Sequence, residues 1–167
     1  MTYTIRPVRP SDIAAVTEVE AICFPAAEAA TGESFKARIV AFPECFFVAE
    51  SEGKIIGFIN GCATDSKTIC DEMYENSACH KTDGAYQSIF GLDVLPDYQR
   101  QGIAADLMNH MIGDAKNKGR KGLILTCKDR LIHYYAKFGY KNMGVSESVH
   151  GGAVWYDMIL EFGAQES

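Results

Sequence analysis

The sequence predicts an α/β (α+β) fold in which one mixed, mostly antiparallel sheet of about seven strands carries helices on both faces. Segments with apolar residues at helical spacing alternate with short apolar, β-branched segments, the pattern expected of such layered domains. The chain has 167 residues, of which 47% are hydrophobic and 23% are charged, which suits one globular domain of ordinary size. No linker-like stretch divides it, so we predict a single domain over residues 1–167 with a core at about 3–162.

The first half of the chain is predicted to form a strand, two helices and a hairpin. Asp12 can start a helix, and apolar residues then recur every three or four positions until the helix ends before Pro25. A turn at Gly53, where a positive φ is easiest, joins two apolar and aromatic segments into a β-hairpin. The predicted elements are a strand at 3–8, helices at 13–23 and 33–42, and strands at 45–50 and 55–63.

The second half begins with a polar stretch, Asp65–Tyr86, that shows little periodicity. We expect it to be a long loop with a short helix and to form a wall of the substrate site. A strongly amphipathic helix then follows Gly102 and ends near Gly119. Leu123–Cys127 is fully apolar, as in a strand in the interior of a sheet. The remaining predicted elements are strands at 87–95, 141–149 and 153–161 and a short helix at 131–138.

The charge balance and the cysteine pattern exclude several classes of protein. The net charge is −6, from 22 acidic and 16 basic residues, which argues against a nucleic-acid partner. This charge suits a soluble protein, and attraction of a cationic amine is the alternative interpretation. The six cysteines form no CxxC pair and the four histidines do not cluster with them, so we expect no metal site. No apolar run resembles a membrane span or a signal peptide, which predicts a cytoplasmic location and no membrane partner.

The segment from Leu92 to Ala104 carries the most specific signal. A strand ends, a turn follows, and a helix opens near Gly102 and Ala104, two small residues that let a ligand approach the backbone. Free N–H groups and the helix dipole favour an anion at a helix start, and Arg100 adds a positive charge. This pattern suits a pyrophosphate. The alternative is an ordinary strand–helix turn in which small residues serve packing.

Two motifs resemble those of the GNAT superfamily of acyl-CoA N-acyltransferases. Gln99-x-x-Gly102-x-Ala104 matches the family's Q/R-x-x-G-x-G/A signature, and His133–Tyr140 is similar to its F/Y-Y-x-K-x-G-F/Y element. The predicted order of elements is also the family's, so the resemblance covers nearly the whole chain. Within the family, the sequence is most similar to the arylalkylamine (serotonin-type) N-acetyltransferase branch, on segments 125–132 and 137–140 and on the long loop.

The resemblance implies that acetyl-CoA is the co-substrate and that the amine attacks its thioester directly in a ternary complex. Tyr135 matches the family's general acid, which gives a proton to the departing thiolate. Backbone N–H groups near Leu92, Asp93 and Val94, where splayed central strands admit the acyl-CoA, would stabilise the tetrahedral intermediate. No covalent cysteine is required, and Cys127 is expected in the core. The residues expected to bind the pyrophosphate are Arg100, Gln101, Gly102, Ile103, Ala104 and Ala105.

The sequence departs from this branch at the step in which the amine loses its proton. Two histidines of the branch are replaced here by Ser88 and Phe90, so their proton relay is missing. Asp93, His150 and an ordered water chain remain as candidates for this step. The residues expected to line the acceptor site are Phe24, Ser88, Phe90 and His150, and Phe58 is a further candidate whose alternative place is the core.

The sequence therefore predicts an acetyl-CoA-dependent N-acetyltransferase that acts on a primary amine, with a small arylalkylamine as the expected acceptor. The alternatives are a protein or peptide N-acetyltransferase and a non-catalytic acyl-CoA-binding sensor. The sensor would keep the Gln99–Ala104 loop but would need no acid at Tyr135. As partners we expect a small-molecule amine and no nucleic acid, and the chain is expected to be a monomer or a homodimer.

Overall fold

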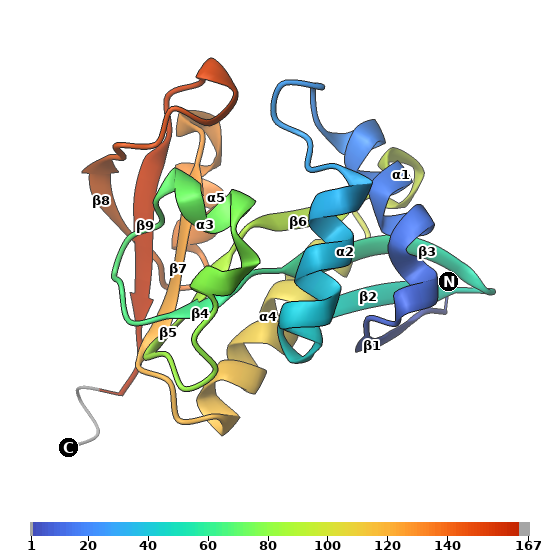
Figure 1. Cartoon of the computed structure of the whole chain (residues 1–167), viewed down its shortest axis with the longest axis horizontal. Coiled ribbons are helices and arrows are strands. Elements are labelled where there is room, and N and C mark those ends of the chain that lie inside the picture. Colours follow the sequence, from blue (N-terminus) through green and yellow to red (C-terminus); the bar gives the residue numbers. More distant parts are fainter. Residues whose placement is uncertain (1, 164–167) are drawn as a thin grey trace. The chain divides into compact units, whose positions relative to one another are not determined.

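A computed structural model of the protein describes residues 2–163 of the chain. These residues form two compact units, and each unit is built from separate parts of the sequence. Unit 1 contains the described residues up to Gly61 together with Gly91–Met111. Unit 2 contains Cys62–Phe90 and the described residues from Ile112 onward. Figure 1 shows the elements of both units, coloured along the sequence and labelled as they are named below.

The sheet of unit 1 has four strands, and every neighbouring pair is antiparallel. In the order in which they lie, the strands are β1 (Thr4–Pro7), β2 (Phe46–Ser51), β3 (Lys54–Asn60) and β6 (Gly91–Val94). The β2–β3 turn confirms the predicted hairpin. Its central residues, Glu52 and Gly53, have φ angles of 51° and 79°. A positive φ at both positions is typical of a type I′ turn, whose twist matches that of the two strands.

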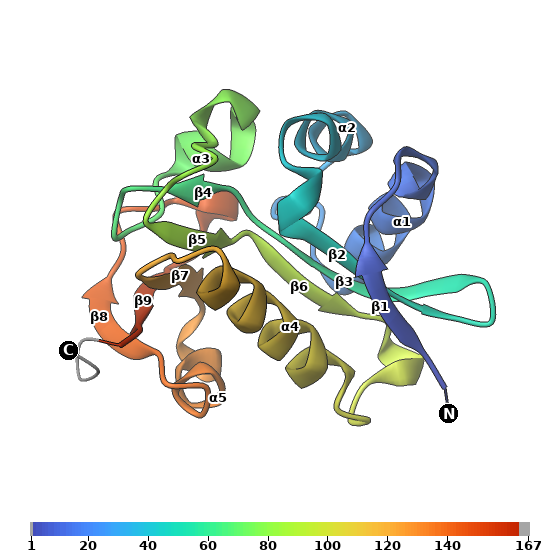
Figure 2. The ribbon, with the colours of Figure 1, turned by 90° about the horizontal axis from the view of Figure 1, so that it is seen from below.

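Two helices, α1 (Ile13–Cys23) and α2 (Gly32–Ala41), cover one face of this sheet, as Figure 2 shows. Their apolar faces confirm the predicted helical spacing, and they enclose the core of unit 1 together with the strands. At its centre the Phe58 ring lies 5.5 Å from the Phe35 ring and 5.6 Å from the Phe46 ring, measured between centroids. The opposite face of the sheet carries the first part of α4 (Ile103–Asn117).

The sheet of unit 2 has five strands, and α3 and α5 lie on its opposite faces (Figure 2). Strands β5 and β7 are parallel, and the other neighbouring pairs are antiparallel. In spatial order the strands are β4 (Ala63–Thr64), β5 (Tyr86–Ile89), β7 (Gly122–Cys127), β9 (Tyr156–Glu161) and β8 (Lys141–Val145), and the helices are α3 (Asp71–Glu75) and α5 (Ile132–Ala136). Short 3-10 turns lie at Pro10–Asp12, Pro43–Cys45, Ser77–Cys79, Pro96–Tyr98, Asp129–Leu131 and His150–Gly152.

The class of fold is confirmed, but the expectation of a single seven-stranded sheet is wrong. Two predicted strands are each divided between the two sheets. The segment predicted as 87–95 bends at Phe90 and contributes β5 to one sheet and β6 to the other. The segment predicted as 55–63 is interrupted at Gly61 and Cys62 in the same way, and it forms β3 and β4. Strand pairing between distant segments decides this division, and the apolar pattern along the chain does not report it.

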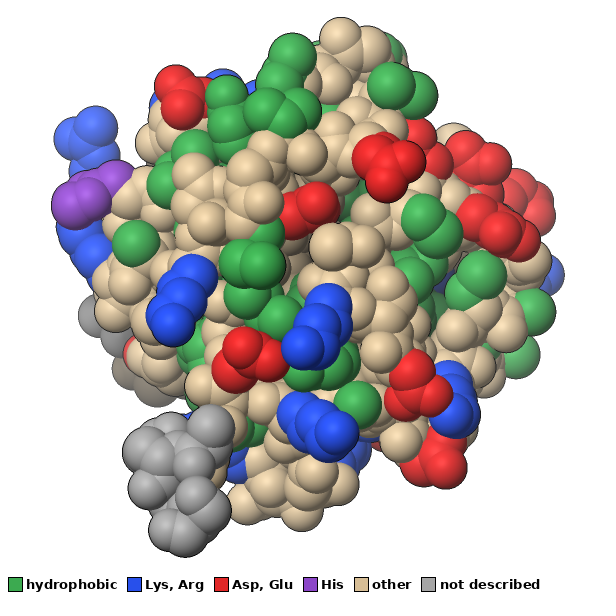
Figure 3. Space-filling model, turned by 90° about the vertical axis from the view of Figure 1, so that its left-hand side faces the viewer, with side chains coloured by type: hydrophobic (Ala, Val, Ile, Leu, Met, Phe, Trp, Pro, Cys, Tyr) green, Lys and Arg blue, Asp and Glu red, His purple; other side chains and the backbone are tan. Residues whose placement is uncertain are grey.

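One edge of the unit 2 sheet is formed by β8, and all five of its residues are exposed. Figure 3, viewed from the side of the molecule on which β8 lies, shows hydrophobic side chains in separate groups among Lys, Arg, Asp and Glu. Within residues 2–163, no helix has the length and apolar character needed to cross a membrane. The same residues contain no group of three or more His, Cys, Asp or Glu side chains placed to hold a metal ion.

Candidate functional site

The loop between β6 and α4 is the expected pyrophosphate site, and its backbone is left-handed at two positions. Arg100 has a φ of 65° and Gly102 a φ of 83°. A Cβ atom built on Gly102 would meet no other atom within 4 Å, so the space above this residue is open. The first backbone hydrogen bond of α4 is donated by the Asp106 N–H to the Gly102 carbonyl at 2.9 Å. The N–H groups of residues 103–105 therefore have no partner inside the helix. Open space next to unpaired helix donors is the arrangement that favours an anion.

Gln99, the first residue of the signature, has a structural role in this loop. Its Nε2 donates a hydrogen bond to the Val94 carbonyl at 3.0 Å, which ties the turn to the end of β6. The Tyr98 N–H also donates back to the Leu95 carbonyl at 2.9 Å. The signature therefore fixes the exit of the strand relative to the start of the helix, as a preformed ligand site requires.

Strand β6 lies at the edge of its sheet, with β3 as its neighbour in that sheet. The Leu95 N–H donates to the Ile56 carbonyl at 2.9 Å, toward β3. Alternate residues of a strand point their N–H groups to opposite edges, so the N–H groups of Leu92 and Val94 point away from β3. These donors are suitable for a thioester carbonyl oxygen. The same geometry directs the Asp93 N–H into the sheet, which does not favour its expected part as a backbone donor.

Tyr135 lies in α5 of unit 2 and is half-buried. Its ring packs edge-on against Tyr134 at 5.2 Å and against Tyr140 at 6.0 Å, between centroids. Burial raises the pKa of Tyr134, and it raises that of Tyr140 far more because Tyr140 is only 3% exposed. The Tyr140 hydroxyl is therefore inside the unit, while Tyr134 and Tyr135 retain some exposure.

An aromatic cluster in unit 2 brings together two of the residues expected at the acceptor site. The Tyr74 ring lies 4.9 Å from Phe90 and is stacked on His150 at 5.0 Å, between centroids. Trp155 continues the cluster at 6.1 Å from His150. The Tyr74 hydroxyl and the Thr126 hydroxyl share a hydrogen bond of 2.8 Å, which anchors α3 to β7. We call Tyr74, Phe90, His150 and Trp155 the aromatic cluster.

Sequence reasoning missed Tyr74, although it found the loop that carries it. The expected short helix within Asp65–Tyr86 is α3, which confirms that part of the prediction. Tyr74 is the one phenylalanine, tyrosine or tryptophan between residues 65 and 85, and that isolation was the available signal. An aromatic residue alone in a polar loop needs a packing partner or a ligand.

The other expected acceptor residues have different surroundings. Ser88 is fully buried in β5, and its hydroxyl donates to the Cys62 carbonyl at 2.8 Å, so it serves the sheet. Phe24 is half-buried directly after α1, and its N–H donates to the Glu20 carbonyl at 3.0 Å. Phe58 is fully buried in the core of unit 1, its alternative place. The roles of Ser88 and Phe24 toward a substrate stay predictions.

A second group, of which sequence reasoning found only Asp93, lies on the α1/α2 face of the unit 1 sheet, and we call it the carboxyl cluster. It consists of Glu20 from α1, Arg38 from α2, Asn60 from β3 and Asp93 from β6. All four are buried, with exposed fractions between 1% and 7%. Arg38 donates to the Asn60 side-chain carbonyl at 3.1 Å, and the Ala30 N–H donates to Glu20 Oε2 at 2.8 Å.

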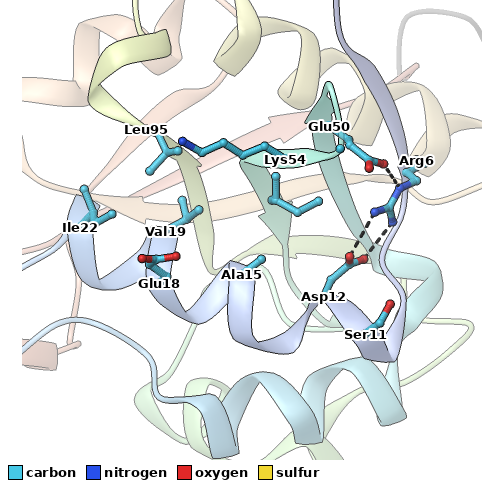
Figure 4. Close-up of a pocket in the computed structure, with 12 residues that line it drawn as sticks. Arg6, Ser11, Asp12, Ala15, Glu18, Val19, Ile22, Glu50, Lys54 and Leu95 are labelled. Atoms are coloured by element: carbon cyan, nitrogen blue, oxygen red, sulfur yellow. Dashed lines mark hydrogen bonds and ion pairs between the residues drawn. The ribbon is translucent and has the colours of Figure 1, made fainter.

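A separate pocket of about 420 Å³ opens on unit 1 beside α1 and the β2–β3 hairpin, as Figure 4 shows. Arg6 closes one side of it by donating to Asp12 at 2.9 and 3.1 Å and to Glu50 at 2.7 Å. The residues expected from the sequence to bind cofactor or acceptor do not line this pocket. Its other lining residues are Ser11, Ala15, Glu18, Val19, Ile22, Gly53, Lys54, Ile55 and Leu95.

Asp12 in this pocket is expected to make stability depend on pH. Burial alone would raise its pKa, but hydrogen bonds from the Arg6 guanidinium and the Arg9 N–H bring the pKa below its ordinary value. A lowered carboxyl pKa contributes stability that is fully present above the ordinary Asp pKa and is lost as the pH falls through the lowered folded-state pKa. Asp12→Asn should therefore lower the free energy of unfolding by about 1–3 kcal/mol at neutral pH.

Urea unfolding of wild type and Asp12→Asn across acidic and neutral pH measures this effect. The difference between the two proteins should begin to shrink below the ordinary Asp pKa of about 3.9, and it should disappear at a pH below the lowered folded-state pKa. Asp97→Asn, at an exposed position, is the matched control and should unfold like the wild type. An Asp12→Asn deficit that stays constant down to that pH would contradict the ionic explanation.

The comparison with known families identifies the class of protein that this loop and fold define. Residues 13–140 match the model of the acetyltransferase (GNAT) family. Because the match covers more than half of the chain, the protein belongs to this family, which confirms the resemblance to the GNAT superfamily. The similarity to the arylalkylamine branch is not specifically supported by the match.

Individual relatives are more distant. Human N-acetyltransferase 8 is 29% identical over 105 residues, which cover 61% of this chain and 40% of that protein. The loading GNATL domain of CurA from Lyngbya majuscula has a TM-score of 0.84 at 17% identity, over 96% of this chain and 98% of that domain. Arabidopsis thaliana Naa50, solved with the bisubstrate analogue CoA-Ac-MVNAL, has a TM-score of 0.74 at 18% identity, over 97% of this chain and 100% of the other. The chain spans less than half the length of the curated relatives it matches.

Proposed function

We propose that the protein is an acetyl-CoA-dependent N-acetyltransferase that transfers the acetyl group to the primary amine of a small molecule. The observation that carries this proposal is the open, left-handed turn at Gly102, followed by the N–H groups of residues 103–105, which have no partner inside the helix. This turn lies in a chain that belongs to the GNAT family, at the motif Gln99-x-x-Gly102-x-Ala104 that resembles the family's signature. Arg100, Gln101, Gly102, Ile103, Ala104 and Ala105 would hold the pyrophosphate.

In this proposal the chain polarises the thioester and supplies a proton to the leaving group. The N–H groups of Leu92 and Val94 would donate to the thioester oxygen, on which negative charge develops during attack. Tyr135 would give its proton to the departing sulfur, because a tyrosine of ordinary pKa near 10 stays protonated at neutral pH. No cysteine nucleophile takes part. Burial raises the pKa of the Cys127 thiol to about 11, so it carries little thiolate at neutral pH.

For the acceptor we propose an arylalkylamine or alkylamine. The aromatic cluster supports this assignment, because its rings can contact an aromatic or apolar body and their faces attract an ammonium group. Trp155 already attracts a cation in this way, since Lys128 Nζ lies 5.7 Å from the centre of its ring. His150 and Phe90 would then act as walls of the acceptor site.

An amine panel tests the proposal and its acceptor class together. Release of coenzyme A thiol is measured with acetyl-CoA and either phenethylamine, tryptamine, hexylamine, spermidine or short peptides with free N-termini. We expect the two arylalkylamines to give the highest kcat/KM. Much faster acetylation of spermidine or of peptides would overturn the acceptor class and leave the transferase standing. Tight acetyl-CoA binding without transfer to any amine would favour the sensor alternative.

A further inference from the structure

The carboxyl cluster of unit 1 places two carboxyl groups and one guanidinium group together in a buried environment. Asp93 is 1% exposed, and neither of its carboxyl oxygens has a hydrogen-bond donor among the described residues as long as both acids are ionised. The side chains of Asp93 and Glu20 meet, and this contact becomes a hydrogen bond once one of them holds a proton. With one proton on the pair, the charges of Glu20, Asp93 and Arg38 cancel. A buried group without net charge has the smallest desolvation penalty.

The groups around Asp93 come from three elements, α1, α2 and β3. Burial raises its pKa well above the ordinary value, the charge of Glu20 on α1 raises it further, and Arg38 on α2 opposes both. Cys23 on α1 also faces the pair, and burial and these two acids raise the pKa of its thiol to about 12. Asn60 on β3 contributes no charge. Asp93 is therefore a more basic carboxylate than an exposed aspartate, as a proton acceptor near neutral pH must be.

The carboxyl cluster lies next to Gly91, a position on β6 that has no side chain. Gly91 lies two residues before Asp93 on the same face of β6 and is partly exposed. A Cβ atom built on Gly91 would lie 3.1 Å from Asp93 Oδ1, 3.5 Å from Asn60 Nδ2 and 3.7 Å from Glu20 Oε1. A small polar atom at this place would therefore be in hydrogen-bond range of Asp93 Oδ1 and close to Glu20 Oε1. A side chain at this position would fill that space.

From this placement we infer that the Asp93–Glu20 pair takes the proton that the acceptor ammonium must lose before attack. The inference rests on the proposed function and decides between the candidates that the missing histidine relay left for this step, which were Asp93, His150 and a water chain. A proton would reach the pair at Gly91, which is partly exposed on the α1/α2 face of β6.

Every proton in the acetyl transfer has a donor and an acceptor. One proton passes from the ammonium to the carboxyl pair and later to solvent, and the nitrogen lone pair forms a bond to the thioester carbonyl carbon. The carbon–sulfur bond then breaks, and the sulfur leaves with its electron pair and takes a proton from Tyr135. The second nitrogen proton restores Tyr135 by way of solvent. The products are the N-acetyl amine, coenzyme A thiol and one proton.

The first test is the pH dependence of kcat/KM for phenethylamine in wild type and Asp93→Asn. Asparagine keeps the shape of the side chain and removes the titrating group. We expect Asp93→Asn to lower kcat/KM about a hundredfold at neutral pH and to lose the wild-type decline toward acidic pH. A phenethylamine with two fluorine atoms on its benzylic carbon has a lowered ammonium pKa, so a larger fraction of it is already deprotonated at neutral pH, and it should recover part of the rate. Asp157→Asn, at a half-buried strand carboxyl whose pKa burial also raises, is the matched control and should keep the wild-type profile.

The second test measures stability and needs no turnover. A carboxyl pKa raised by folding contributes stability at low pH that is lost as the pH rises through the folded-state pKa. Asp93→Asn removes this loss. We therefore expect its urea midpoint to equal that of the wild type near about pH 4 and to exceed it at pH 8. An Asp93→Asn protein that is less stable than wild type at pH 8 would show a charged, structural aspartate and would overturn the inference.

Gly91→Ala gives a third readout, because it leaves both acids in place and fills the space above them. It should slow amine acetylation and leave acetyl-CoA affinity unchanged. Wild-type rates and an unchanged pH profile in Asp93→Asn would refute the inference. It would also be refuted if the decline of kcat/KM toward acidic pH disappeared in His150→Ala and not in Asp93→Asn. Both results presuppose that the wild type acetylates an amine. A wild type that binds acetyl-CoA and acetylates nothing in the panel counts against the proposed function, whereas the urea comparison still decides whether the pair holds a proton.

Discussion

Tyr135→Phe should lower turnover about a hundredfold to ten-thousandfold, the usual contribution of a positioned general acid. Phenylalanine keeps the ring and its edge-on packing against Tyr134 and Tyr140, and it removes the hydroxyl group that carries the proton. Acetyl-CoA affinity should therefore remain close to that of the wild type. Single-turnover measurements give the rate of the chemical step, and calorimetry gives the affinity.

Tyr134→Phe is the matched control for this prediction. The two tyrosines are adjacent in α5, and both are partly buried. If Tyr134 serves packing, its loss of a hydroxyl should change turnover little. Equal losses in the two variants would point to a general disturbance of α5. A wild-type chemical rate in Tyr135→Phe would remove the acid from the proposal.

Gly102→Val is expected to weaken acetyl-CoA binding about tenfold to a hundredfold, which corresponds to about 1.4–2.7 kcal/mol. Valine places methyl groups in the open space that the phosphate must enter. It also resists the φ of 83° that directs the start of α4, because β-branched residues are strained in the left-handed region. Calorimetry with acetyl-CoA and with free coenzyme A measures the loss.

Gly119→Val separates the effect on the ligand from the backbone strain. Gly119 ends α4 with a φ of 76°, and a Cβ atom built there would also meet no atom within 4 Å. Both variants should lose stability by a similar amount, whereas only Gly102→Val should lose affinity. A comparable loss of affinity in Gly119→Val would remove the basis for placing the pyrophosphate at Gly102.

Local patterns in the sequence were sufficient for most of the fold. Helical spacing located α1, α2 and α4 to within about two residues, and the turn at Gly53 located the hairpin. The division of strands between two sheets could not be predicted. The apolar pattern runs through the bend at Phe90 without interruption, and pairing with distant strands decides which sheet each part joins.

The candidate site was predictable where a motif carried it and was missed where tertiary contacts made it. Gly102 and Tyr135 lie in recognisable motifs, and their roles stay predictions. Glu20 left one signal: it follows Val16 by four residues, on the face of α1 that was expected to be buried. Arg38 lies in the same way beside Ile39 on the buried face of α2. An acid or a base on an apolar helix face needs a partner, but the sequence did not show that both face Asp93.

The way in which the chain is shared between its two units has a consequence for synthesis and folding. Unit 1 needs β6 and the first part of α4, which come after the whole of the first segment of unit 2. Unit 2 needs β9, which ends at Glu161. No cut at a single position in the chain would therefore release either unit complete. As the chain leaves the ribosome, the β1–β2–β3 meander must keep its β3 edge unpaired until residue 94 has emerged, so that edge is a site for chaperone binding or for misassembly on the nascent chain.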